Sequence, residues 1–226
     1  MELDRIEQVT FKSLQHVPWD LVIAVSGYEA RATYLAEHIR VTKGRKIVLA
    51  YREERTRLHR PDNDRKYELL RYDPVVVSEA SSDEIKKLLE EIFSGENIPL
   101  NILVDYSCMQ KEWYAAILQF FLEHDLTRKP LNVYFSYTPS VYARPVHRRF
   151  SFFKSKKPKY PVGAKGEKPP ALILGLGFEK DLIRNVYHQA KSSEIWLCYA
   201  DPVFDQRFVQ ELEKIHHDIV SITQDT

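Results

Sequence analysis

The sequence predicts an α/β protein with a Rossmann-like, doubly wound, mostly parallel sheet flanked by helices. Its apolar runs are continuous rather than alternating, which is typical of strands buried on both faces. Helix patterns separate these runs. In addition, a strand–turn–helix–strand unit occurs twice, over 20–51 and 170–199. We therefore predict a single domain over 1–226, with a basic flexible insertion or linker over 143–169.

Strands are expected wherever a short apolar run is bounded by polar residues, and eight runs fit, the last of them with the weakest pattern. They cover about 21–26, 46–51, 74–78, 101–105, 131–137, 171–176, 194–199 and 218–222. Both copies of the repeated unit close their first strand on glycine, an aromatic residue and glutamate. In parallel sheets ligands bind beyond the carboxyl ends of the strands, so a ligand site is expected there.

Helices are expected between the strands. Ser81 and Glu84 can form a capping box ahead of apolar residues at helical spacing. Further stripes of this spacing begin at Trp113 and at Phe204. The charged stretch 52–72 is interpreted as a solvated connection with a short helix.

Composition excludes several classes of protein. The 226 residues include 33 Lys and Arg against 32 Asp and Glu, so no net field draws the whole chain to nucleic acid or membrane. Two cysteines, Cys108 and Cys198, cannot build a disulfide framework or a four-thiolate metal site. No apolar run reaches the roughly 20 residues of a membrane helix. We expect a cytoplasmic protein without membrane contact, cofactor or metal.

The loop after the first strand contains Ser26, Gly27, Tyr28, Glu29 and Arg31. A glycine directly after a strand allows close approach of a ligand, and an arginine there can bind phosphate. Glu29 has two interpretations at this point. Its charge suits the first turn of a helix, or it acts chemically, and the recurrence of the arrangement at Gly177 and Glu179 fits both.

The loop after the fourth strand contains an acid, a hydroxyl and a cation at close spacing, Asp105, Ser107 and Lys111. We expect Ser107 to cap the following helix and Lys111 to lie one turn later, so that all three face one crevice. Such groups can bind ribose, base edges and phosphate. Tyr199 and Asp201, after the seventh strand, are weaker candidates for the same edge.

The pattern Asp105-x-Ser107-x-x-x-Lys111 resembles the signature of CARF domains, Rossmann-like sensors of CRISPR-associated and related prokaryotic defence systems. Their other ligand-contacting loop follows the first strand, where this chain has Ser26 to Glu29. The resemblance covers roughly residues 20–140. It implies a homodimer, or a subunit of a larger defence complex, that binds a nucleotide or cyclic oligonucleotide. The basic segment and the repeated final unit depart from that family.

The basic segment 143–169 leaves two interpretations open. It is a plain surface connection, or its cations contact a polyanion or a nucleic-acid backbone while its aromatic residues stack on bases. The cations that would make such contacts are Arg148, Arg149, Lys154, Lys156 and Lys157.

Three functions compete on the sequence alone. The preferred one is a nucleotide-binding sensor or effector component. The first rival is a hydrolase or glycosidase of the same architecture that cleaves NAD, a nucleoside or a cyclic nucleotide through Glu29 or Glu179. The second is an interaction subunit that docks nucleic acid or a partner protein through 143–169.

The sequence predicts no metal site. His216 and His217 have no partner at metal-ligand spacing.

Overall fold

The computed structural model describes residues 5–79, 81–95, 98–123, 131–141, 171–178, 180–189, 194–199 and 206–224. Contacts within the chain define two compact units, Met1–Ser140 and Val141–Thr226, and each is described here by itself. The single domain over 1–226 stays a prediction. The segment 143–169 lies outside the described residues.

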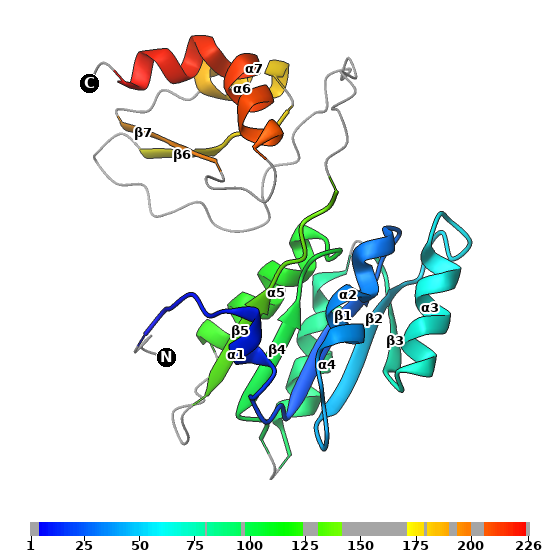
Figure 1. Cartoon of the computed structure of the whole chain (residues 1–226). Coiled ribbons are helices and arrows are strands. Elements are labelled where there is room, and N and C mark those ends of the chain that lie inside the picture. Colours follow the sequence, from blue (N-terminus) through cyan, green and yellow to red (C-terminus); the bar gives the residue numbers. More distant parts are fainter. Residues whose placement is uncertain are drawn as a thin grey trace. The chain divides into compact units, whose positions relative to one another are not determined.

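Unit 1 is built on a five-stranded, all-parallel sheet with the strand order β3-β2-β1-β4-β5 (Figure 1). This confirms the predicted fold class, and each strand lies within two residues of its expected bounds. The strands are β1 Leu21–Ser26, β2 Arg45–Tyr51, β3 Asp73–Val77, β4 Asn101–Asp105 and β5 Asn132–Ser136.

Helices cover both faces of this sheet. They are α1 Phe11–Leu14, the 3₁₀ helix η1 Ala30–Thr33, α2 Tyr34–His38, α3 Arg60–Leu69, α4 Ser82–Phe93 and α5 Lys111–Glu123. On one face α4 and α5 pack against alternate strand residues such as Ile23 and Val104. On the other, α1, α2 and α3 pack against Ala24 and Leu103. Because β1 is covered on both faces, all six of its residues are buried.

Two of the helix predictions are confirmed in detail and one is partly wrong. The Ser81 hydroxyl accepts a hydrogen bond from the Glu84 amide at 3.2 Å, so the expected serine cap begins α4. The reciprocal half of the box is not formed, because the Ser81 amide donates to Ser78 O and the Glu84 carboxylate pairs with Arg52. The apolar stripe from Trp113 is the buried face of α5. The stretch 52–72, however, is more than a solvated connection, because its helix α3 buries Arg60, Asn63 and Tyr67.

Unit 2 contains β6 Ala171–Gly175, α6 Lys180–Gln189, β7 Glu194–Cys198 and α7 Arg207–Gln224. Strands β6 and β7 pair in parallel, so strand–helix–strand topology is confirmed for both copies of the repeat. The strand expected at 218–222 is wrong, since these residues belong to α7. Leu212, Ile215 and Ile219 recur at helical spacing and are buried, and this pattern overrides the short apolar run.

None of the helices in the described part of the chain is both long and apolar enough to span a membrane.

Candidate functional site

Successive strands are added to the sheet in one direction from β1 to β3 and in the opposite direction from β4 to β5. The point at which this direction reverses lies between β1 and β4. From β1 the chain proceeds outward through β2 and β3, and it then returns to add β4 and β5 on the other side. At such a point the loops after the two neighbouring strands turn toward opposite faces, and the crevice between them is the usual ligand site of open α/β sheets. The loops with Gly27 and with Asp105 both begin here, as expected.

Gly27 lies directly against the loop after β4. A Cβ atom added at Gly27 would lie 2.5 Å from the Cβ of Cys108 and 3.4 Å from its Sγ. The space that a side chain at position 27 would fill is therefore occupied by Cys108 of the neighbouring loop, and not left open for a ligand. Burial raises the pKa of Cys108 to about 12, and the negative charge of Glu29 adds to the shift. Burial therefore disfavours the thiolate, which is the form of cysteine that acts as a nucleophile.

Asp105 ends β4 as a buried carboxyl group, with 1% of the residue exposed. Its Oδ1 accepts hydrogen bonds from the amide of Ser107 at 3.0 Å and from the Ser107 hydroxyl. Its Oδ2 is buried and has no hydrogen-bond partner among the described residues. Burial raises the pKa of Asp105, while the bonds from Ser107 and the charge of Arg31 oppose that shift. An orphaned carboxylate oxygen is costly in a folded protein, and it is an acceptor ready for a donor.

Ser107 does not cap the following helix, contrary to the sequence prediction, because α5 begins only at Lys111. The Ser107 hydroxyl instead accepts a hydrogen bond from the Thr138 amide at 2.7 Å and donates its proton to Asp105. The residue thus joins the loop after β4 to the loop after β5. Lys111 is exposed at the start of α5.

Arg31 lies in η1 and reaches across the loop after β5. Its Nη1 donates to the carbonyl of Thr138, and its guanidinium lies 5.1 Å from the ring centroid of Tyr137. Its Nε and Nη2 donate to the two carboxylate oxygens of Glu29 at 2.9 and 3.1 Å. Burial disfavours the charged form, but the bonds to Glu29 and Tyr137 outweigh it and leave the pKa of Arg31 raised. Only 16% of the Arg31 side chain is exposed, against 52% for Glu29.

Helix α3 and its N-cap residue hold the loop after β1 by hydrogen bonds to main-chain carbonyls of that loop. The Asn63 amide group donates to the carbonyls of Gly27 and Glu29, both at 2.9 Å, and the Tyr67 hydroxyl donates to Ala32 O at 2.5 Å. The His59 amide donates to Tyr28 O at 3.3 Å. The loop carbonyls are thereby tied to α3, so the backbone that carries Glu29 and Arg31 is held in place.

Ser26 belongs to a second polar network under α3. Its hydroxyl donates to Asp64 Oδ1 at 2.5 Å, and the same oxygen accepts from Arg60 Nε at 2.7 Å. Arg60 is almost completely buried and also donates to Tyr51 O at 3.0 Å. Ser26 is therefore engaged in structure, although the sequence marked it as a ligand contact.

Tyr28 joins an aromatic stack. Its ring stacks on Tyr51 with a centroid separation of 5.4 Å, and Tyr51 stacks on Trp113 at 4.5 Å. The Tyr51 hydroxyl donates to Cys108 O at 2.9 Å and accepts from the Gln110 amide at 3.1 Å. This stack ties the loop after β1 to the start of α5.

Sequence reasoning missed the role of α3. Asn63, Arg60 and Tyr67 lie in a charged stretch with little apolar pattern, and the signal for their burial is their spacing of three and four residues, one face of a helix. The end of the fifth strand, with Thr138, is also expected at this edge of the sheet. Its contacts with Arg31 and Ser107 depend on the pairing of β4 with β5, which local spacing does not show.

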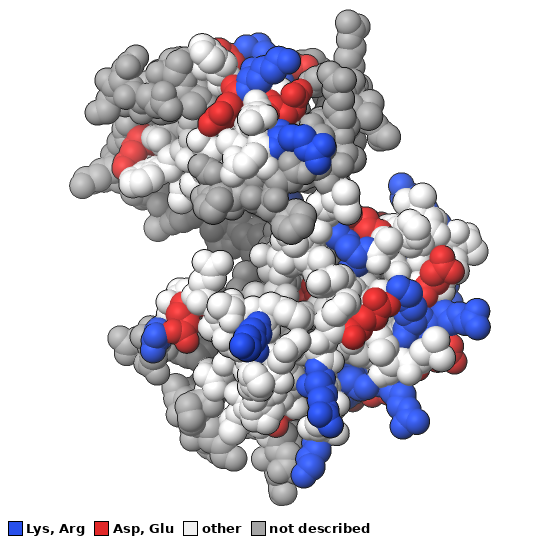
Figure 2. Space-filling model, viewed as in Figure 1, with Lys and Arg blue, Asp and Glu red and all other residues white. Residues whose placement is uncertain are grey.

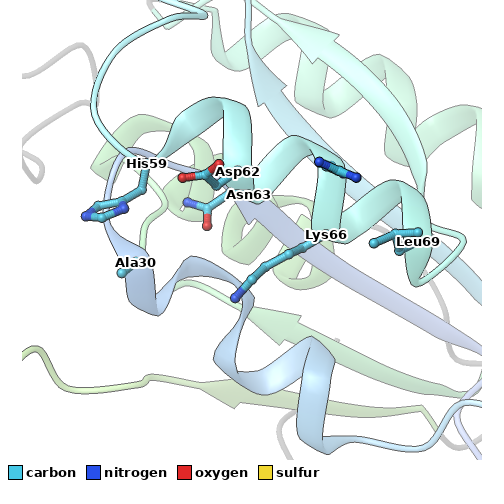
Figure 3. Close-up of a pocket in the computed structure, with 7 residues that line it drawn as sticks. Ala30, His59, Asp62, Asn63, Lys66 and Leu69 are labelled. Atoms are coloured by element: carbon cyan, nitrogen blue, oxygen red, sulfur yellow. The ribbon is translucent and has the colours of Figure 1, made fainter.

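A pocket of about 420 Å³ opens between α3 and the start of η1 (Figure 3). In Figure 3, the Lys66 side chain points from α3 toward η1, the helix that contains Ala30, and His59 and Leu69 lie at opposite ends of α3. The pocket is lined by Ala30, His59, Asp62, Asn63, Arg65, Lys66 and Leu69. The Lys66 ammonium pairs with Glu37 at 2.6 Å. The pocket borders the loop after β1, because its lining residue Ala30 directly follows Glu29.

The remaining candidates fall elsewhere. Gly177 and Tyr199 belong to unit 2, where Gly177 O is 2.6 Å from Nε2 of the fully buried His216. Glu179 and Asp201, together with Arg148, Arg149, Lys154, Lys156 and Lys157, lie outside the described residues. The predictions for these residues remain open.

On the face of unit 1 shown in Figure 2, Lys and Arg side chains predominate in the lower part, and acidic and cationic side chains lie next to one another toward the right. Among the described residues, no group of three or more His, Cys, Asp and Glu side chains is arranged to hold a metal ion. The charges near the site are local pairs such as that of Arg31 and Glu29.

A scan against protein-family models and searches of curated proteins and of solved structures found no match to this chain.

Proposed function

We propose that unit 1 binds a small nucleotide-derived ligand at the carboxyl edge of its sheet, between β1 and β4. The observation that carries this proposal is the buried, unpartnered Oδ2 of Asp105 at the point where the strand order reverses. A carboxylate there accepts hydrogen bonds from donors, and ribose hydroxyls and base amino groups are such donors. The cations of Arg31 and Lys111 are the groups of this edge that suit phosphate.

The resemblance of Asp105-x-Ser107-x-x-x-Lys111 to the CARF signature makes cyclic oligonucleotides the first ligands to examine, and a sensor in prokaryotic defence the corresponding role. Within that signature the three residues take different parts. Asp105 offers its free oxygen, Lys111 is exposed, and Ser107 orients Asp105 and Thr138. A ligand role for Ser107 is therefore indirect.

The rival hydrolase gains less support. Both carboxylate oxygens of Glu29 accept hydrogen bonds from Arg31, and half of the side chain is exposed to solvent. A general base or nucleophile that acts on ribose needs a carboxylate free to approach the substrate and partly desolvated. In this arrangement Arg31 occupies both oxygens of Glu29, so the carboxylate is not free to approach a substrate.

The test is calorimetric titration of the full chain with adenosine, AMP, NAD and cyclic oligonucleotides, comparing wild type with Asp105→Asn. The amide keeps the size of the carboxyl group but removes its charge and presents a donor at the free position. We expect affinity for the ligand that binds to fall by about tenfold or more, the value of a hydrogen bond to a charged group. Far-UV circular dichroism verifies that the variant is folded.

Three further variants locate the site. Lys111→Ala should weaken phosphate-bearing ligands by about two- to fivefold, whereas Lys43→Ala, an exposed lysine before β2 at the opposite end of the sheet, should leave affinity unchanged. Asp62→Asn removes a carboxylate from the pocket beside α3. If Asp62→Asn weakens binding and a folded Asp105→Asn does not, the ligand occupies that pocket and the proposed site is wrong.

A further inference from the structure

We infer that the Glu29 carboxylate occupies, in the ligand-free protein, the position on Arg31 that a ligand phosphate takes on binding. This inference rests on the proposed function and adds to it a specific exchange: an internal anion leaves the guanidinium and the phosphate of the ligand replaces it. Glu29 is then an internal competitor of the ligand, in place of the catalytic role that the sequence left open for it.

The first support is the geometry of the ion pair. Nε and Nη2 of Arg31 donate to two different oxygens of Glu29, at 2.9 and 3.1 Å. This two-bonded arrangement is the one in which a guanidinium binds carboxylate and phosphate alike. The edge of Arg31 that holds Glu29 is therefore already shaped for two oxygens of a phosphate.

The second support is that Arg31 is fixed while the Glu29 side chain is not. Arg31 is held from its other edge by Thr138 O and lies over the Tyr137 ring. The carbonyl of Glu29 is bound by Asn63, so the backbone stays in place during an exchange. Among the described residues, the Glu29 carboxylate forms hydrogen bonds with Arg31 alone, and 52% of its side chain is exposed to solvent. A rotation of that side chain alone frees the guanidinium.

The third support is the position of this pair relative to Asp105. The Arg31 charge is close enough to Asp105 to lower the pKa of that carboxyl, although burial still raises it overall. Thr138 joins the two groups, since its carbonyl accepts from Arg31 and its amide donates to Ser107 on Asp105. A ligand with donors at Asp105 and an anion at Arg31 spans one continuous set of contacts. The ligand class is accordingly a nucleoside with at least one phosphate.

The exchange predicts that neutralising Glu29 strengthens anion binding. In the wild-type protein a phosphate must displace a carboxylate, and in Glu29→Gln it displaces a weaker neutral acceptor. Because exposed ion pairs contribute modestly, the expected gain in affinity is about two- to fivefold. A catalytic or direct ligand-binding Glu29 predicts the opposite sign or no change.

The experiment measures the affinity of inorganic pyrophosphate, AMP and adenosine for wild type, Glu29→Gln, Arg31→Ala and the double variant. Glu84→Gln is the matched control, because Glu84 pairs with Arg52 at 2.8 Å on another part of unit 1. We expect Glu29→Gln to raise the affinity for pyrophosphate and AMP and to leave the affinity for adenosine unchanged. In the Arg31→Ala background the same substitution should have no effect on any of these affinities. Glu84→Gln should change none of these affinities.

The outcomes separate the inference from the proposed function. The exchange at Arg31 is wrong if pyrophosphate binds Glu29→Gln no more tightly than wild type, or if it binds neither protein. If adenosine binds a folded Asp105→Asn variant as tightly as it binds wild type, the ligand site at Asp105 is wrong. The pyrophosphate result would then still show whether Glu29 competes for Arg31.

Discussion

The two copies of the strand–helix–strand repeat have the same topology but different burial. Strand β1 of the first copy is buried at all six positions, whereas β7 of the second alternates between exposed and partly buried residues. The first copy has β4 as a further neighbour and helices on both faces, and the β6–β7 pair is a sheet of two strands. A repeated pattern thus specifies how a segment folds locally, but the strands and helices around it decide how much it buries.

The largest expected effect separates two tryptophans. Trp113 is fully buried on Tyr51, and Trp196 is 59% exposed on β7. We expect Trp113→Ala to lower the free energy of unfolding by about 3–5 kcal/mol and Trp196→Ala by less than about 1 kcal/mol. Urea unfolding followed by far-UV circular dichroism measures both. Similar losses for the two variants would contradict the difference in burial between the core of unit 1 and strand β7.

A smaller effect separates two glycines at strand ends. No described glycine has a positive φ, so a side chain at either position is limited only by space. An added Cβ at Gly27 would meet Cys108 at 2.5 Å, whereas one at Gly175 meets nothing within 4 Å. Gly27→Ala should cost about 1–3 kcal/mol of unfolding free energy, and Gly175→Ala should be nearly neutral.

The Gly27 effect can be traced to its contact by a double-mutant cycle. If the Cβ of Cys108 causes the loss, Gly27→Ala should cost much less in a Cys108→Gly background than in the wild-type protein. Additive losses from the two substitutions would show that the cost at Gly27 does not come from its contact with Cys108.

The smallest expected effect is a pH dependence with opposite sign for two acids of unit 1. Burial raises the pKa of Asp105 above its usual value of 3.8, so the folded state holds that proton more tightly than the unfolded state. Its contribution to stability is therefore fully present below the unfolded pKa and lost as pH rises through the folded one. The stability of Asp105→Asn relative to wild type should increase from about pH 4 upward.

Glu37 is the matched case. Its hydrogen bond from Lys66 lowers the pKa below the usual 4.5 against the effect of burial. Its contribution is present above the unfolded pKa and lost as pH falls through the folded one, so Glu37→Gln should destabilise the protein near neutrality and less in acid. Thermal unfolding of both variants across pH measures the slopes. Equal slopes would show that Asp105 is not desolvated as described.

The fold of unit 1 could be predicted because its strands are continuous apolar runs and its caps are local. Ser81 and Glu84 lie three residues apart, and the bond between them needs no tertiary contact. The sequence predicts a strand at the end of α7 because the short segment with Ile219, Val220 and Ile222 fits a strand and a helix alike. Only the packing of Leu212 and Ile219 decides between them.

The candidate site was predictable only in part. Parallel topology brings the loops with Glu29 and Asp105 to one edge, and the sequence indicated this. It could not show that Gly27 makes room for Cys108, or that Ser107 binds Asp105 and Thr138 rather than capping a helix. These contacts join residues far apart in the chain, and they depend on strand register and loop packing that local spacing does not encode.

The central claim is that a ligand binds between β1 and β4 in contact with Asp105. Amide chemical-shift mapping of the ¹⁵N-labelled protein during titration with AMP tests it most directly. We predict shifts concentrated in residues 27–31, 105–111 and 137–138, with none around Lys43 at the opposite end of the sheet. Shifts confined to other residues, such as those of the pocket beside α3, or no shifts at saturating AMP and pyrophosphate, would contradict the account.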